Sequence, residues 1–316
     1  MRILPMHKLL QLAGKLLGRN KLSILIYHQV LAEHDPMRPS EPTAEVFDWH
    51  MRLLQRYFTP LSLDDALHHL QHNSLPANAV CVTFDDGYLN NLTVAQPILA
   101  KYNIPATVYI ATGFSQGTNM WNDRLIYLFA DTKRQQINLQ GELITLADWP
   151  QRRELAQQWL MKLKYLPIDQ RLVAVENLYQ ENEAAEQAPL MMNPNEIKQL
   201  AAAGVCIGAH TINHPILKVL SPAEQQNEIV QSKQQLEQWA ERPVTHFAYP
   251  NGVLGRDFDE TAVNIVQNAG FDSAVTTDWG VSTGENSVFK LKRFTPWDRS
   301  RLKFHIRLVN RYWQKG

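Results

Sequence analysis

The chain has 316 residues, of which 45% are hydrophobic and 20% charged, so it is long enough for one large domain or two small ones. Lysine plus arginine equals aspartate plus glutamate, at 31 each, so no global charge favours nucleic-acid binding. The two cysteines, Cys81 and Cys206, lie in apolar β-like runs. We therefore expect buried free thiols rather than a disulfide framework.

Residues 1–22 predict an N-terminal amphipathic helix with a basic polar face. Basic residues such as Lys8 and Lys15 interrupt its leucines, so the segment has no clear signal-peptide core. No apolar run approaches the roughly 20 residues that a membrane-spanning helix needs. The helix either packs on the domain or lies on an anionic membrane surface, which leaves a cytoplasmic and a peripheral membrane location open.

Short apolar runs alternate with segments of helical period along residues 23–298, which predicts parallel strand pairing in an α/β sheet or barrel. Asn195 is expected to cap one helix, and Gly204 and Gly270 to follow the ends of two helices. The predicted strands are 23–30, 80–84, 106–111, 205–209, 245–249 and 273–276. The predicted helices are 45–57, 63–71, 93–102, 195–203, 223–240 and 257–269.

Residues 117–192 break this alternation and predict a mostly helical insertion between two core strands. Its aromatic residues either stack on sugar rings or form a small core of their own. They are Trp121, Tyr127, Trp149 and Trp159. Residues 299–316 predict a second basic amphipathic helix, at the C-terminus.

Acidic and imidazole side chains stand at the ends of two predicted core strands. Asp85 and Asp86 follow the strand that ends at residue 84, and His210 and His214 follow the strand that ends at residue 209. In a parallel sheet the carboxyl ends of strands gather at one edge, where chemistry usually occurs. Two histidines, one aspartate and an open position form a common catalytic metal site.

The motif "TFDDG", followed far downstream by "HTINHP", resembles the polysaccharide deacetylase family, also called NodB homology or carbohydrate esterase family 4. The resemblance implies a distorted (β/α)7-type barrel and metal-dependent removal of an N- or O-acetyl group from a glycan. It assigns Asp85 as general base and Asp86, His210 and His214 as metal ligands. Zn²⁺ is the expected metal, with Co²⁺, Ni²⁺ or Fe²⁺ as alternatives, and water on the metal is the expected nucleophile.

The next family motif reads Arg-x-Pro-Tyr/Trp-Gly, whereas this chain has "AYPNG" with Ala248 in place of the arginine. The difference resembles the branch of the family that modifies exported poly-N-acetylglucosamine during exopolysaccharide biosynthesis. The resemblance places Pro250 in the substrate pocket and makes the Tyr249 N–H the expected oxyanion donor. Arg293, in "LKRF", either replaces the missing arginine electrostatically or forms a surface ion pair.

The family's general acid stands in a Leu-x-His motif that the C-terminal third of this chain lacks. The strand "SILIYHQV" instead ends in His28, which matches a circularly permuted version of the fold and makes His28 the expected acid. The alternative is a hydrogen-bonded core histidine. "TTDWG" resembles the motif that supplies the acetyl pocket, so Trp279 is a candidate wall and Asp278 its supporting partner, unless this stretch is a plain turn.

Two other functions compete with polysaccharide deacetylation. An amidase or deacetylase acting on a small or lipid-linked sugar would keep the fold and the metal. A degenerate, non-catalytic glycan-binding protein is favoured by Ala248 and opposed by the intact Asp85, Asp86, His210 and His214.

Overall fold

The computed structural model describes residues 3–313, which form two compact units. One unit, the barrel unit, comprises Met1–Glu33, Ser40–Gln116 and Met192–Gly316. The other, the insertion unit, comprises His34–Pro39 and Gly117–Met191. The insertion expected from the sequence therefore forms a compact unit of its own. That unit also includes the short segment His34–Pro39, which precedes β2 (Thr59–Pro60) in the chain.

The barrel unit is built on an eight-stranded sheet in which every strand pair is parallel. Seven strands follow the order β1-β3-β4-β7-β8-β9-β10. The two residues of β2 pair with the first two residues of β3. A parallel bridge between Leu25 and Phe294 joins β1 to β10. The sheet is thus a nearly closed parallel barrel, which confirms the predicted fold class. The strands are β1 (Ser23–Tyr27), β2 (Thr59–Pro60), β3 (Ala79–Phe84), β4 (Ala106–Ile110), β7 (Cys206–Ala209), β8 (His246–Ala248), β9 (Ser273–Trp279) and β10 (Leu291–Arg293).

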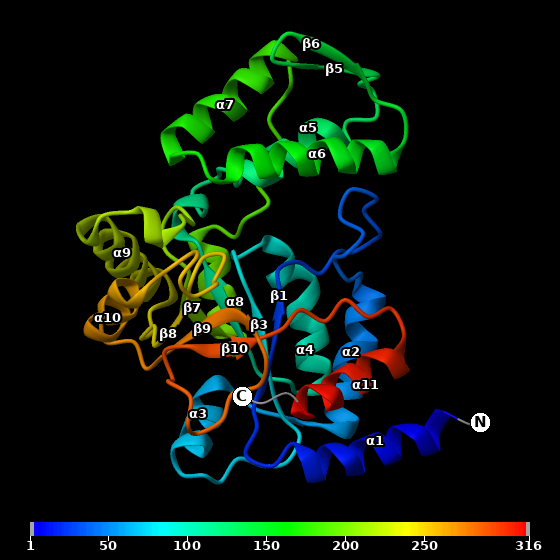
Figure 1. The fold of residues 1–316 in the computed structure, drawn as a ribbon, viewed down its shortest axis with the longest axis vertical. Helices are drawn as coiled ribbons and strands as arrows, with labels where there is room; N and C mark the ends of the chain where they lie inside the picture. The colour runs from blue at the N-terminus through cyan, green and yellow to red at the C-terminus, as the bar shows by residue number, and fades with distance from the viewer. Residues whose placement is uncertain (1–2, 314–316) are drawn as a thin grey trace. The chain divides into compact units, whose positions relative to one another are not determined.

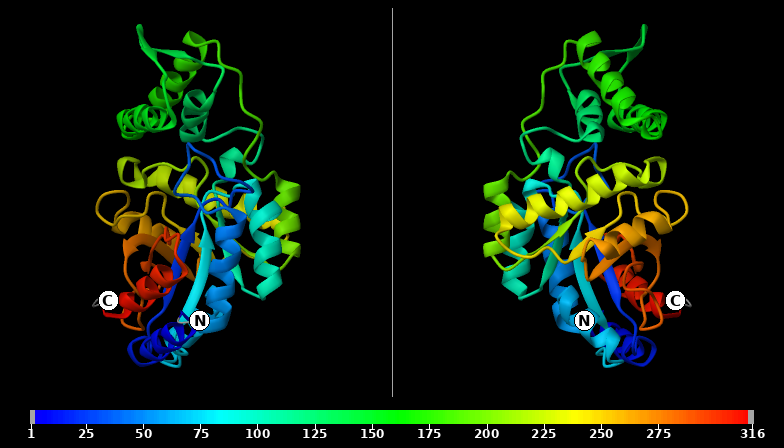
Figure 2. Two further views of the ribbon diagram at one scale, coloured as in Figure 1. Left: turned by 90° about the vertical axis from the view of Figure 1, so that its right-hand side faces the viewer. Right: turned by 90° about the vertical axis from the view of Figure 1, so that its left-hand side faces the viewer.

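Burial explains why these runs are strands. Every residue of β1, β3 and β4 is buried, as expected where helices cover the outer face of a parallel sheet and side chains fill its interior. Figures 1 and 2 show the helices arranged around the strands. The helices of the barrel unit are α1 (Ile3–Leu17), α2 (Ala44–Tyr57), α3 (Leu63–Gln71), α4 (Gln96–Tyr102), α8 (Pro194–Ala202), α9 (Pro222–Ala240), α10 (Glu260–Asn268) and α11 (Arg301–Asn310).

Helix α3 lies at the amino-terminal end of the strands, in the lower part of Figure 1. Its apolar residues Leu63, Leu67 and Leu70 share a buried cluster with Leu22 and Cys81. The helix therefore closes this end of the barrel and leaves the carboxyl ends of the strands for the site.

Three details differ from the sequence prediction. Asn193, not Asn195, caps α8, because Pro194 occupies the first helical position and Glu196 completes a capping box with Asn193. The predicted helix 93–102 is a π-helical turn, Asn91–Ala95, that continues into α4. The short strands β2 and β10 were not predicted, since two or three residues carry too little periodicity.

Helix α1 packs against α11 through a histidine pair. His7 Nδ1 lies 2.8 Å from His305 Nδ1, and the two rings stack. Residues 1–2 and 314–316 of the predicted terminal helices lie outside the described residues. Within residues 3–313, no helix is both long and apolar enough to cross a membrane.

The insertion unit contains three helices and a two-stranded hairpin around its own apolar core. Trp159 is buried in this core, and Trp121 and Trp149 pack against it, so these three aromatic residues have a structural role. The elements are α5 (Trp121–Ala130), β5 (Gln136–Leu139), β6 (Glu142–Thr145), α6 (Trp149–Lys164) and α7 (Ile168–Glu181).

The buried histidine pair predicts an acid-sensitive fold. Burial lowers the pKa of His305 to about 4, so the unfolded chain binds more protons than the folded chain as the pH falls from about 6.5 towards 4. The free energy of unfolding should therefore decrease over this interval, by at most about 1.4 kcal/mol per pH unit for one group. His305→Phe should flatten this pH dependence in urea unfolding, while the exposed His34→Gln should not. Identical slopes for wild type and His305→Phe would contradict the assignment.

Candidate active site

The four motif residues lie together at the carboxyl ends of β3 and β7. His210 Nε2 and His214 Nε2 lie 3.6 and 3.5 Å from Asp86 Oδ1. One ligand atom from each of these three residues lies within 4.8 Å of the others. Asp85 Oδ2 is 3.9 Å from His210 Nε2. The sequence placed these residues at two strand ends, and the parallel register brings the strand ends together.

The backbone at these strand ends adopts rare conformations. Asp86 has φ of 74°, Thr211 of 68° and His214 of 50°, all in the left-handed region that non-glycine residues seldom occupy. Gly87 follows with φ of 87°, and a Cβ there would meet the side chain of Ile110 at 2.9 Å. Such conformations persist only where surrounding contacts impose them, and they concentrate at functional sites.

Hydrogen bonding fixes the orientation of His210. Its Nδ1 lies 2.7 Å from the carbonyl oxygen of Ala248, so Nδ1–H donates and Nε2 is left as the lone-pair nitrogen. Burial lowers the pKa of His210, which favours the neutral imidazole that a metal requires. Although Ala248 lacks the family's guanidinium, its backbone thus orients a proposed ligand.

The loop that carries His214 is held by Glu228 of α9, a residue that the sequence analysis missed. Glu228 Oε2 accepts from the amides of Ile212 and Asn213 at 2.8 and 2.9 Å. Thr211 Oγ1 accepts from the His214 amide at 3.1 Å. Glu228 lies among several glutamines and glutamates of α9 with no motif around it, so no local sequence signal indicated its role.

Asp85 forms a bidentate ion pair with Arg293 inside the barrel. Arg293 Nη1 and Nη2 lie 2.7 Å from Asp85 Oδ1 and Oδ2, and the arginine side chain is fully buried. Burial alone would raise the pKa of Asp85, yet Arg293, together with His210 and His28, outweighs it and lowers that pKa to about 2. Arg293 also donates to the Thr276 carbonyl at 2.9 Å. The guanidinium missing at Ala248 is therefore supplied by β10.

His28 follows β1, next to the end of β3, because Tyr27 pairs with Phe84 in the parallel register. The Asn91 side chain donates to the His28 carbonyl at 2.8 Å, from within the π-helical turn. Burial would lower the pKa of His28, but the nearby carboxylates of Asp86 and Asp85 outweigh it and raise that pKa. A raised pKa suits a group that donates a proton.

The oxyanion role expected for Tyr249 is wrong. Its N–H donates to the Val275 carbonyl at 3.3 Å in the β8–β9 pairing, and its hydroxyl donates to the Phe289 carbonyl at 3.2 Å. In the motif Arg-x-Pro-Tyr/Trp-Gly, the residue between Pro250 and Gly252 is Asn251. Asn251 has φ of 60°, and its carbonyl accepts from Thr277 Oγ1 at 2.6 Å, which fixes this turn.

The remaining pocket residues lie on the turn after β8 and at the end of β9, where Asp278 and Trp279 are the last two residues. Pro250 is buried, and its carbonyl accepts from the Gly252 amide at 2.7 Å. The Asp278 amide donates to Thr276 Oγ1 at 3.2 Å. Trp279 is half-exposed, and its ring centroid lies 4.9 Å from that of Trp297 in a tilted arrangement. An acetyl-pocket role for Pro250, Asp278 or Trp279 stays a prediction.

The donor set of Asp86, His210 and His214 fits a divalent cation. Two imidazole nitrogens and one carboxylate oxygen converge, and one imidazole is already fixed in the tautomer that exposes Nε2. This set suits Zn²⁺, and also Co²⁺, Ni²⁺ or Fe²⁺, and leaves at least one position open.

Comparison with known proteins identifies the family. A family model described as polysaccharide deacetylase matches residues 72–274. The chain belongs to the polysaccharide deacetylase family. The matched range contains the two aspartates and the two motif histidines but neither His28, which follows β1, nor Arg293, which ends β10. As a member of this family, the chain is a hydrolase that acts on N-acetyl amide bonds.

Individual relatives agree with this assignment. The Bacillus subtilis (strain 168) protein YxkH, a polysaccharide deacetylase by name, is 23% identical over 275 residues, which cover 86% of this chain and 70% of YxkH. Streptococcus pyogenes deacetylase PplD has a TM-score of 0.61 at 20% identity and covers 92% of this chain and 98% of its own. IcaB from Ammonifex degensii has a TM-score of 0.59 at 18% identity, covering 93% and 98%. These structures share the barrel fold.

Because Asp85 and Arg293 are a buried ion pair, removal of the arginine should greatly lower the stability of the fold. Arg293→Ala leaves a buried carboxylate without its partner, so the free energy of unfolding should fall by about 3–5 kcal/mol in urea titrations. Arg293→Lys should lose less stability but should still lower activity, because lysine cannot hold both carboxylate oxygens. Lys101→Ala, which breaks the exposed pair with Asp48, should leave the free energy of unfolding nearly unchanged, because solvent screens exposed ion pairs. Unchanged stability and activity in Arg293→Ala would refute the role.

Proposed function

We propose that the chain is a metal-dependent deacetylase that hydrolyses acetamido groups of a polysaccharide. The observation that carries the proposal is the convergence of Asp86, His210 and His214, with Asp85 and His28 beside them. Family membership supports the polysaccharide class of substrate. The published description of PplD, as a complex with acetate, names the product that this reaction would release.

Asp86, His210 and His214 would hold the cation, which when bound supplies Lewis acidity to the acetyl oxygen and to attacking water. Asp85, kept ionised by Arg293, would accept the proton of that water. The turn at Asn251 offers a backbone N–H as the oxyanion donor in place of the engaged N–H of Tyr249. His28 would donate its proton to the departing amine nitrogen. A cation at Asp86 would offset part of the attraction that raises the pKa of His28.

Half-exposed aromatic residues next to the end of β9 support an extended sugar substrate. Trp279 and Trp297 are 49% and 41% exposed, and the Arg311 guanidinium lies 4.2 Å from the Trp279 ring centroid. The exposed parts of the two indole rings suit the apolar faces of pyranose rings, so we assign this pair to sugars that flank the one being deacetylated.

Substitution of the aspartates separates catalysis from metal binding. Asp85→Asn should lower acetate release from an acetylated polysaccharide by at least about 100-fold while metal content stays near normal. Asp86→Asn should lose both acetate release and bound metal, whereas His28→Gln should lose acetate release but keep the metal. Asp65→Asn, an exposed change on α3, is the matched control. Metal content is measured by elemental analysis and activity with and without chelator. Full activity in Asp85→Asn and Asp86→Asn would reject the site, and release only from a small acetamido sugar would change the substrate class.

We also propose that α1 attaches the enzyme to an anionic membrane surface. The inner face of the helix packs on the domain through His7, Leu10 and Leu17, whereas its outer face exposes an apolar stripe. That stripe consists of Met6 (45% exposed), Leu9 (62%), Leu12 (58%) and Leu16 (71%). Lys8, Lys15 and Arg19 flank the stripe, and no acidic residue precedes Glu33 in the sequence. Apolar and cationic surfaces together match an anionic lipid interface.

If α1 attaches to an anionic membrane, binding of the protein to lipid vesicles should depend on the negative charge of the lipid and on the exposed leucines of α1. The protein should sediment with phosphatidylglycerol vesicles but not with phosphatidylcholine vesicles, and salt should weaken the binding. Leu12→Gln combined with Leu16→Gln should weaken it about tenfold or more, since each leucine loses apolar burial. Leu143→Gln, at a leucine 65% exposed on β6, serves as control. Equal binding of wild type and the double variant would contradict the proposal.

A further inference from the structure

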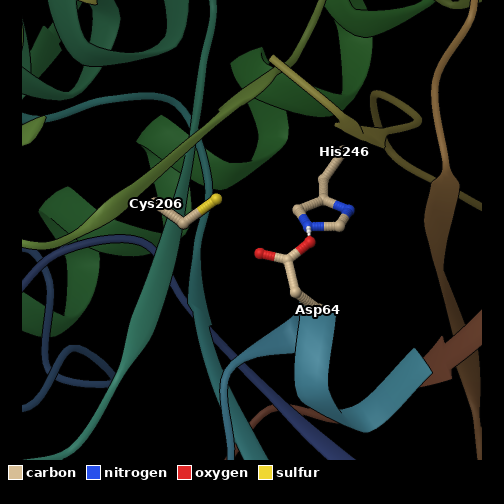
Figure 3. A group of neighbouring side chains, drawn as sticks. All are labelled: Asp64, Cys206 and His246. Carbon is tan, nitrogen blue, oxygen red and sulfur yellow. Dashed lines mark hydrogen bonds and ion pairs between the residues drawn. The ribbon is translucent and has the colours of Figure 1, made fainter. Parts of the chain in front are cut away.

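A second group of metal-ligating side chains lies at the amino-terminal end of the barrel strands. Asp64 comes from the first turn of α3, Cys206 begins β7 and His246 begins β8. One donor atom of each residue lies within 4.8 Å of the other two. Figure 3 shows the sulfur, the carboxylate and the imidazole turned towards one another from three separate elements.

The contacts of His246 already resemble those of a metal ligand. Its Nε2 lies 3.0 Å from Asp64 Oδ1, and its Nδ1 lies 2.9 Å from Ser273 Oγ. A ligating imidazole commonly donates its other N–H to a nearby oxygen, which fixes the ring orientation. Ser273 is fully buried and can accept that hydrogen bond. The ring is therefore held on one side and faces Asp64 and Cys206 on the other.

We propose that Asp64, Cys206 and His246 bind a zinc-class divalent cation distinct from the catalytic one. Thiolate, imidazole and carboxylate form a donor set that suits Zn²⁺ and excludes Mg²⁺ and Ca²⁺, which prefer oxygen alone. Tetrahedral zinc places such donor atoms roughly 3.3–3.6 Å apart. The separation of His246 Nε2 from Asp64 Oδ1 is 3.0 Å, and the sulfur lies within 4.8 Å of both residues' donor atoms, so a modest side-chain adjustment brings all three to these distances. Asp64 can supply it, because its side chain is 65% exposed, and water can complete the coordination.

Binding exchanges a proton for the cation. The Cys206 thiol has to lose its proton before its sulfur can ligate the cation, because the thiolate is the metal ligand. On coordination the thiol proton leaves to solvent, and the imidazole proton resides on Nδ1, hydrogen-bonded to Ser273. The hydrogen bond to His246 lowers the pKa of Asp64, which therefore offers a charged carboxylate.

The two metal groups cannot share one ion. Cys206 and His210 stand four residues apart on β7 and its extension, a separation of about 13 Å along a strand. The catalytic group lies at the carboxyl ends of the strands, and the new group joins α3 to the amino ends of β7 and β8. A cation bound here would link α3 to β7 and β8, so its role would be structural rather than catalytic.

Cobalt substitution tests the site, because the donor atoms of the two groups differ. The protein with Co²⁺ should show sulfur-to-cobalt charge-transfer absorption in the near ultraviolet, and Cys206→Ser should lose it. Cys81→Ser is the matched control, since Cys81 is the other free cysteine and lies on β3 with its thiol towards the Ser62 carbonyl. Asp86→Asn should retain the absorption. Its absence in wild type, or its persistence in Cys206→Ser, would overturn the proposal.

Zinc content and stability give an independent measure that does not depend on a buried substitution. Wild type should hold two zinc ions per chain, and Asp64→Asn should hold one with deacetylase activity retained. Asp65→Asn, in the same helical turn, should hold two. In an Asp86→Asn background zinc should still raise the unfolding temperature, and adding Asp64→Asn should abolish that shift. No shift in Asp86→Asn, or an equal shift in both, would leave an ordinary Asp64–His246 ion pair as the explanation.

Discussion

The buried ion pair between Asp85 and Arg293 is the interaction on which the active site depends. Two adjacent carboxylates, Asp85 and Asp86, end a fully buried strand, where their mutual repulsion and desolvation would favour protonation. Arg293 holds Asp85 ionised through two hydrogen bonds. Asp86 faces the two histidines that complete the donor set. In the proposed mechanism each acid has its own cationic partner, Arg293 for Asp85 and the bound cation for Asp86, and this division would separate their chemical roles.

Opposite ends of one barrel carry different kinds of chemistry. At the carboxyl ends, strained turns and polar loops present oxygen and nitrogen donors to an open position. At the amino ends, α3 closes the interior with leucines, and the proposed thiolate-containing group would attach this helix to β7 and β8. A catalytic cation needs an exchangeable site, whereas a structural cation benefits from a softer and more enclosed donor set. The same strands could carry both proposed cation sites, because the residues of one site lie at the carboxyl ends of the strands and those of the other at the amino ends.

The sequence predicted what depends on local pattern. Strand and helix periodicity located most elements, and the parallel architecture brought Asp85, Asp86, His210 and His214 to one edge. Contacts between residues far apart in the sequence could not be predicted in this way, because no local pattern marks them. Glu228 reaches the His214 loop from α9, and Arg293 reaches Asp85 from a three-residue strand. The Tyr249 assignment failed because an amide at a strand end has a second possible acceptor, the neighbouring strand, which no motif records.

The bridge between Leu25 and Phe294 has a consequence for how the enzyme is made. It joins the first strand to the last, and these two strands carry His28 and Arg293 to the same mouth of the barrel. A growing chain emerges from the ribosome with β1 unpaired on one edge until almost the whole polypeptide has been synthesised. Asp86, His210 and His214 can therefore come together before β10 has been synthesised, whereas Asp85 acquires its buried partner Arg293 only when the two edges of the sheet meet.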